Sequence, residues 1–384
     1  GETEEFQYCW ENIKKPYLLA VRDDSSETPI DDLTIEANAV KWIRSNPESF
    51  CNTTDKKVLS QVLQDYDLET ADFYRWKVSY TQDEIAALIE DKMNLEHDIQ
   101  EAGVQMILLV EDSIRFYSSI LPNLYNYILE QSKNFSQEAL NRHAATMRMR
   151  GRPKVVLART YEEAQKLYDK YSDNTLGVIS DARFPLKSAA KAFGNEVMPE
   201  EKPKHRTDTF GREKCPDAGL QLFRYIRKND PFVPLIIESS ESENRAKAEA
   251  EGFRFVDKNS KKMSVDLRRL MEEHMGFGDF IFRDPKTHEE IMRIHSLKEL
   301  QDNIFNIPND SMLYHISRNH MSRWLCARAI FPVSAFLKHV TWEKLRDVDA
   351  HRQIIFDAIV QYRHMKNIGI VAVFDRMKFD KYAH

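Results

Sequence analysis

Two adjacent carboxylates, Glu111 and Asp112, directly follow the apolar run 106–110. An unbroken apolar run of this length is typical of a strand buried on both faces of a parallel sheet. Open α/β sheets bind ligands at the carboxyl ends of their strands, and adjacent carboxylates repel each other unless a cation is nearby. The pair therefore indicates a cation site, although a solvated loop after a strand also fits these two residues.

Three more polar side chains end apolar runs farther along the chain. Asp181 closes the run 176–181, Ser239 lies at the end of 234–240, and Lys258 closes 253–258. Each has a structural alternative, because Asp181 could cap a loop, Ser239 could cap a helix and Lys258 could be a surface lysine. Their common place at strand ends favours a shared site.

The elements that must position these residues alternate regularly. Five strands are predicted at 106–110, 153–158, 176–181, 234–240 and 253–258, and five helices at 114–150, 161–168, 217–227, 245–250 and 265–275. This alternation predicts an α/β fold with a doubly wound five-stranded parallel sheet. In the flavodoxin-like strand order 2-1-3-4-5, strands 1 and 3 flank the switch point, so Glu111 and Asp112 would face Asp181. Three such carboxylates suit Mg²⁺, which prefers oxygen ligands.

Glu111, Asp112, Asp181, Ser239 and Lys258 together resemble the phosphoacceptor set of response-regulator receiver domains. The resemblance implies that Asp181 is phosphorylated and that Glu111 and Asp112 hold Mg²⁺ with it. It further implies that Ser239 is the switch hydroxyl, that Lys258 contacts the phosphoryl group and that Phe255 is the aromatic switch. Three features depart from the family pattern: Ala182-Arg-Phe-Pro with a long insertion at about 186–214, an overlong first helix, and Asn259 in place of the customary proline.

A second resemblance covers roughly residues 80–384. It rests on short segments at 106–115, 149–154, 177–185, 257–260, 276–280 and 313–323. These are similar to bacterial proteins that carry this region in front of a phosphoenolpyruvate synthase/pyruvate phosphate dikinase-type domain. The sequence contains neither a Gly-rich phosphate loop nor the catalytic-histidine motif of those enzymes. The resemblance implies a regulatory front end of a longer protein.

The regions on either side of this unit are less regular. Residues 1–100 are predicted to be a divergent or partial receiver-like α/β segment, with strands at 16–22 and 73–78, a helix at 85–93 and a polar connector at 94–103. Residues 101–275 form the predicted receiver domain. Residues 276–384 are predicted to form a hairpin, at 279–283 and 290–294, followed by helices near 296–305, 311–330, 332–339 and 349–367.

Composition limits the class of protein. The 384 residues are 42% hydrophobic and 30% charged with a net charge of −6, which is ordinary for a soluble globular protein and argues against general nucleic-acid affinity. No apolar stretch approaches the roughly 18 residues of a membrane span, and the acidic start is not a signal peptide. We therefore expect a cytoplasmic protein. The four cysteines form no C-x-x-C pair, and His315 and His320 are interpreted as structural or interaction residues.

The sequence thus predicts a phosphorelay module. A histidine kinase or phosphotransfer protein would phosphorylate Asp181, and the response would reach the C-terminal region, a downstream enzyme or output domain, or a homodimer partner. Two alternatives remain open. One is a pseudo-receiver scaffold that works without phosphorylation; the other is a DNA-binding regulator that uses 316–325 with Arg318 and Arg323.

Overall fold

The computed structural model describes residues 18–22, 72–76, 91, 94–139, 141–187 and 213–368. In the N-terminal part it contains two strands, β1 (Leu18–Arg22) and β2 (Asp72–Trp76), which pair in parallel and confirm two predicted strands. Of the helix predicted at 85–93, only residue 91 is described, and it is helical.

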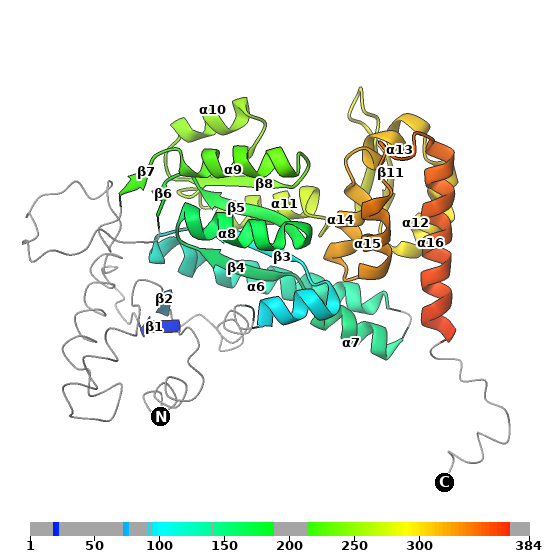
Figure 1. Ribbon diagram of the computed structural model, residues 1–384, viewed down its shortest axis with the longest axis horizontal. Coiled ribbons are helices and arrows are strands. Elements are labelled where there is room, and N and C mark those ends of the chain that lie inside the picture. Colours follow the sequence, from blue (N-terminus) through cyan, green and yellow to red (C-terminus); the bar gives the residue numbers. More distant parts are fainter. Residues whose placement is uncertain are drawn as a thin grey trace, which may run out of the picture.

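A five-stranded parallel sheet forms the centre of the protein (Figure 1). Its strands are β3 (Met106–Val110), β4 (Lys154–Ala158), β5 (Thr175–Asp181), β8 (Leu235–Ser239) and β9 (Arg254–Asp257). Their spatial order is β4-β3-β5-β8-β9, and every neighbouring pair is parallel. This is the predicted flavodoxin-like order, with β3 and β5 at the switch point.

Helices cover both faces of the sheet. α6 (Ile114–Gln137) and α11 (Met263–His274) pack with one face, whereas α8 (Tyr161–Tyr171), α9 (Ala218–Asn229) and α10 (Glu243–Ala250) pack with the other. The apolar strands fit this arrangement, because successive side chains such as Ile107 and Leu108 enter opposite cores and neither is exposed. Each such side chain contributes about 1.5–3 kcal/mol by leaving water.

Two helix boundaries predicted near the first strand of the sheet were wrong. The expected connector at 94–103 is helical through residue 102, because Leu95 is only 5% exposed and packs into the core. The expected single helix at 114–150 is two helices, α6 and α7 (Arg142–Arg150). The Asn141 side chain accepts a hydrogen bond from the Ala144 N–H at 2.7 Å and thereby begins α7 as an N-cap.

The predicted insertion begins and ends in a short ribbon that sequence patterns did not indicate. β6 (Phe184–Pro185) pairs antiparallel with β7 (Lys214–Cys215). Residues 188–212 lie outside the described part of the chain. The ribbon fixes Lys214 near the carboxyl edge of the sheet.

The C-terminal module has its own core of buried aromatic and aliphatic side chains. It contains a hairpin, β10 (Phe280–Arg283) and β11 (Glu290–Ile294), and the helices α12 (Leu297–Asn303), α13 (Asn309–Ile316), α14 (His320–Ala327), α15 (Phe331–His339) and α16 (Val348–Ile368). The hairpin was predicted. The single helix expected over 311–330 was wrong, because the backbone turns at Asn319, which has φ of 54°, and separates α13 from α14. Two 3₁₀ turns, Ser172–Asn174 and Ile304–Asn306, complete the described elements.

The C-terminal module packs at the amino ends of the sheet strands. Asp181 and Ser239 lie at the opposite, carboxyl ends (Figure 1). Arg328 is 2% exposed and joins the parts, because its guanidinium donates to the carbonyls of Gly276 and Gly278 at 2.6 and 2.9 Å. The same guanidinium lies over the ring of Phe135 from α6, at 4.3 Å. Gly276 adopts φ of +83°, and a Cβ there would lie 2.7 Å from the Trp324 backbone. A side chain at this position is therefore excluded.

The imidazoles of His315 and His320 lie together in the C-terminal core, with their Nδ1 atoms 3.0 Å apart. Burial lowers the pKa of His315 to about 4, so the folded protein holds this ring neutral. Because the unfolded chain takes up the proton near pH 6.5, stability falls as the pH drops from about 6.5 to about 4.

We expect His315→Phe to reduce this pH dependence by about 2 kcal/mol, measured by urea unfolding at pH 7 and pH 4.5. The exposed control His339→Phe should leave it unchanged; equal profiles in both variants would contradict the prediction.

Candidate functional site

Three carboxylates meet at the carboxyl edge of the sheet. Glu111 and Asp112 follow β3, and Asp181 is the last residue of β5. One oxygen from each lies within 4.8 Å of the others. Glu111 and Asp112 are buried, whereas Asp181 is partly accessible. The sequence prediction that strands 1 and 3 bring these residues together is therefore correct.

Lys258 lies among these acids. Its Nζ forms an ion pair with Asp181 Oδ1 at 2.9 Å and a very short one with Glu111 Oε2. Burial alone would lower the pKa of the lysine, but the surrounding carboxylates, led by Asp181 and Glu111, raise it. The lysine is therefore a permanent cation beside Asp181.

A second lysine, which sequence reasoning missed, reaches the site from the insertion. Lys214 on β7 forms an ion pair with Asp112 Oδ2 at 2.5 Å. Burial would lower the pKa of Lys214, but Asp112, followed by Glu111 and Asp181, raises it. The site thus contains two cations supplied by the chain itself, Lys258 after β9 and Lys214 on β7.

Glu238 is a fourth carboxyl group that sequence reasoning also missed. It precedes Ser239 on β8 and is paired with Asp181 in the sheet register. Its side chain is fully buried, and within the described residues neither oxygen has a hydrogen-bond partner. Burial raises the pKa of Glu238 to about 7, with Lys258 opposing the shift. An acid inside the apolar run 235–239 was the signal that could have revealed it.

The remaining predicted residues lie around this group. Ser239 is buried, and its Oγ accepts hydrogen bonds from the Glu241 N–H at 3.1 Å and from Asn244 Nδ2 at 2.9 Å. Phe255 on β9 is partly buried, with the Arg245 guanidinium 4.7 Å from its ring centre. Asn259, the departure from the receiver pattern, donates from Nδ2 to the Ser240 carbonyl at 2.9 Å.

The backbone around Asp181 is closely packed. Its Oδ1 accepts the Ala182 N–H at 2.8 Å, and Ala182 in turn accepts the Gly219 N–H at 3.1 Å. A Cβ on Gly219 would lie 2.3 Å from the Asp181 carbonyl, so this position requires glycine. The start of α9 therefore holds the loop that carries Asp181.

The donor set fits a hard divalent cation. Mg²⁺ takes oxygen ligands and keeps several waters, so one oxygen each from Glu111, Asp112 and Asp181 would suit it. Burial raises the pKa of Glu111, and the charges of Asp181 and Asp112 raise it further while Lys258 opposes them. A cation here would relieve that repulsion between carboxylates.

Comparisons with known proteins give limited results. A family model described as a domain of unknown function, DUF8618, matches residues 4–115, a segment that includes β3 and ends just after Glu111 and Asp112. No curated protein matches the chain. Among solved structures, a response regulator receiver domain protein from Clostridium thermocellum is similar at 16% identity, covering 44% of this chain and 94% of its own, with a TM-score of 0.27. The order of the five parallel strands, β4-β3-β5-β8-β9, itself defines the flavodoxin-like fold.

No helix within the described residues is long and apolar enough to cross a membrane.

Proposed function

We propose that residues 101–275 act as a receiver module that accepts a phosphoryl group on Asp181. The observation that carries the proposal is the meeting of Glu111, Asp112, Asp181 and Lys258 at one edge of the sheet. Residues 1–100 and 276–384 would be separate modules that supply input and output. A cytoplasmic location, where phosphotransfer partners act, is part of the proposal.

In this proposal each residue has a distinct task. A carboxylate oxygen of Asp181 attacks the phosphorus of a phosphohistidine partner or a small donor, the bond to the leaving group breaks, and an acyl phosphate forms. Mg²⁺, held by Glu111, Asp112 and Asp181, would neutralise the phosphoryl oxygens. Lys258 adds a fixed positive charge. The Ser239 hydroxyl would then move from its present bonds toward the phosphoryl group, with Phe255 following as the aromatic switch.

Lys214 favours a second candidate function. Because its ammonium already neutralises Asp112, the acids are compensated without a metal ion. A pseudo-receiver that presents a constant interface would need only such internal cations. In that case the C-terminal module would bind its partner equally well in all conditions.

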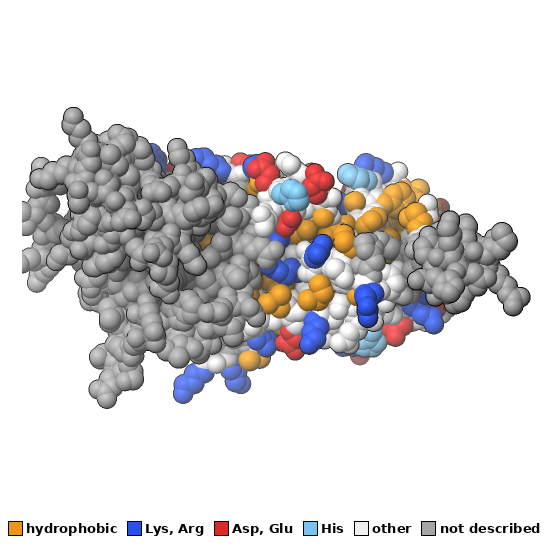
Figure 2. All heavy atoms as spheres, turned by 90° about the horizontal axis from the view of Figure 1, so that it is seen from below, with side chains coloured by type: hydrophobic (Ala, Val, Ile, Leu, Met, Phe, Trp, Pro, Cys, Tyr) orange, Lys and Arg blue, Asp and Glu red, His pale blue; other side chains and the backbone are white. Residues whose placement is uncertain are grey.

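Two wider predictions also remain proposals. We propose that the natural protein continues into a dikinase-type domain that this module regulates; the full reading frame of the gene would test this. DNA binding is a weaker proposal, because basic and acidic side chains are interspersed on the face of the described residues that Figure 2 shows. Salt-dependent duplex binding that is lost in Arg318→Met would support it.

Beryllofluoride separates the first two candidates. With Mg²⁺, it should bind Asp181 as a phosphoryl mimic and shift the amide NMR signals of Ser239 and Phe255. Asp181→Asn should show no shift. The pseudo-receiver predicts that both proteins respond alike and that the oligomeric state does not change.

A further inference from the structure

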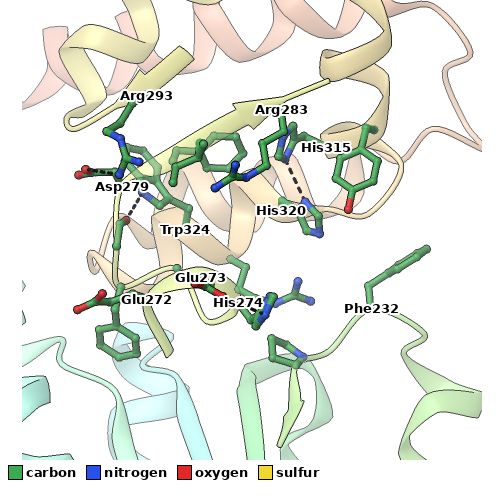
Figure 3. Close-up of a pocket in the computed structure, with 18 of the residues that line it drawn as sticks. Phe232, Glu272, Glu273, His274, Asp279, Arg283, Arg293, His315, His320 and Trp324 are labelled. Atoms are coloured by element: carbon green, nitrogen blue, oxygen red, sulfur yellow. Dashed lines mark hydrogen bonds and ion pairs between the residues drawn. The ribbon is translucent and has the colours of Figure 1, made fainter. Parts of the chain in front are cut away.

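A cavity of about 1100 Å³ lies between the sheet and the C-terminal module (Figure 3). It opens where β8 and β9 begin, which is the end of these strands opposite Ser239 and Lys258. Its walls come from the end of α11, the hairpin, α13 and α14. The volume is large enough for a ligand of nucleotide size.

Cationic and imidazole groups converge at one end of this cavity. Arg323 and His320, three residues apart on α14, share a face of that helix and both line the cavity. His274 at the end of α11 points toward the same space as His320 (Figure 3). Arg254 enters from the first residue of β9. His274 and His320 each lie within the electrostatic range of Arg323. Four nitrogen-rich side chains from three elements thus surround one space.

The acids that line the cavity are engaged elsewhere. Asp279 pairs with Arg293 at 3.3 Å and with His295 at 2.9 Å, and Glu272 accepts a hydrogen bond from the Tyr127 hydroxyl at 3.2 Å. Glu138 lies 3.8 Å from Arg148.

The other two acids are also occupied. Asp284 accepts backbone N–H groups within its own turn. Glu273 is shared between Arg269 at 3.6 Å and His274 at 3.8 Å. Within the described residues, no acid forms an ion pair with Arg323 or Arg254. Burial lowers the pKa of Arg323, and the charge of Asp230 opposes this shift only in part.

We propose that this cavity binds the phosphoryl group of a small phosphorylated molecule. The guanidinium of Arg323 is partly buried and forms no ion pair within the described residues. A phosphoryl group would supply that pair through two parallel hydrogen bonds. The neutral imidazoles of His274 and His320 can donate N–H groups from other directions, which suits a tetrahedral group better than a planar carboxylate. Phe232, 41% exposed at the rim, offers an apolar surface for the rest of the ligand.

Titration calorimetry with pyrophosphate, at constant ionic strength and with EDTA, tests the proposal. EDTA removes divalent metal, so the result does not depend on phosphoryl chemistry at Asp181. Wild-type protein should bind pyrophosphate, and Arg323→Met should weaken binding at least tenfold. The matched control Arg293→Met lines the same cavity but is already paired with Glu290 and Asp279, so it should stay within twofold of wild type.

The thermal midpoint of Arg323→Met and the affinity of Arg323→Lys distinguish a lost binding contact from a damaged fold. Arg323→Met removes a charge that forms no ion pair within the described residues, so its thermal midpoint should not fall. Arg323→Lys should retain part of the affinity. Absence of pyrophosphate binding to wild type would overturn the proposal. So would equal binding by Arg323→Met and wild type, or tighter binding of citrate than of pyrophosphate.

Discussion

Replacing Lys258 by methionine should lower the free energy of unfolding by about 3–5 kcal/mol at pH 8. The ammonium of Lys258 compensates Glu111 and Asp181 directly, and it is also the cation that opposes the raised pKa of Glu238. Without the Lys258 ammonium, Glu111, Asp181 and Glu238 lose the cation that compensates them. Chemical unfolding followed by circular dichroism measures the loss.

The loss should depend on pH. Glu238 has a folded-state pKa of about 7, above the ordinary value near 4.5, so its neutral form stabilises the fold at low pH and this contribution fades as the pH rises toward 7. Lys258→Met strengthens this trend, and the variant should therefore approach wild-type stability at pH 5. The exposed control Lys261→Met should change stability by less than about 0.5 kcal/mol. A similarly small, pH-independent loss in Lys258→Met would be inconsistent with the site described.

Replacing Lys214 by methionine should tighten Mg²⁺ binding about tenfold or more, because a tethered cation and a divalent ion compete for Asp112. Titration calorimetry with MgCl₂ measures the change. The effect should shrink at high salt, where charges interact less strongly.

Lys187 provides a control for the Lys214 variant, since it is an exposed lysine at the other end of the insertion. Lys187→Met should bind Mg²⁺ like wild type, and Asp112→Asn should bind weakly whether or not Lys214 is present. Unchanged affinity in Lys214→Met would show that this lysine does not occupy the metal's place, and it would remove the main support for the pseudo-receiver.

Much of the candidate site could be predicted from sequence because strand ends are local features. Glu111, Asp112, Asp181 and Lys258 each follow an apolar run, and parallel pairing brings the ends of such runs to one edge. Lys214 could not be found in this way. Its position depends on the β6–β7 ribbon, in which two residues before the insertion pair with two residues at its end. Strands of two residues are too short to leave a periodic pattern in the sequence.

The same distinction applies to the fold. Alternating strands and helices predicted the sheet order, whereas boundaries set by single residues were missed. Asn141 begins a new helix through one side-chain hydrogen bond, and Asn319 precedes α14 in a left-handed backbone conformation that separates it from α13. The cavity near Arg323 was also beyond sequence reasoning, because it is formed by segments that meet only when the C-terminal module packs on the sheet.

The most direct test of the central claim is the mass of the intact protein after incubation with acetyl phosphate and Mg²⁺. We predict the addition of one phosphoryl group, located on Asp181 by peptide mapping, which does not form when Mg²⁺ is chelated beforehand and is absent from Asp181→Asn. Unmodified wild-type protein, or equal labelling of Asp181→Asn, would contradict it.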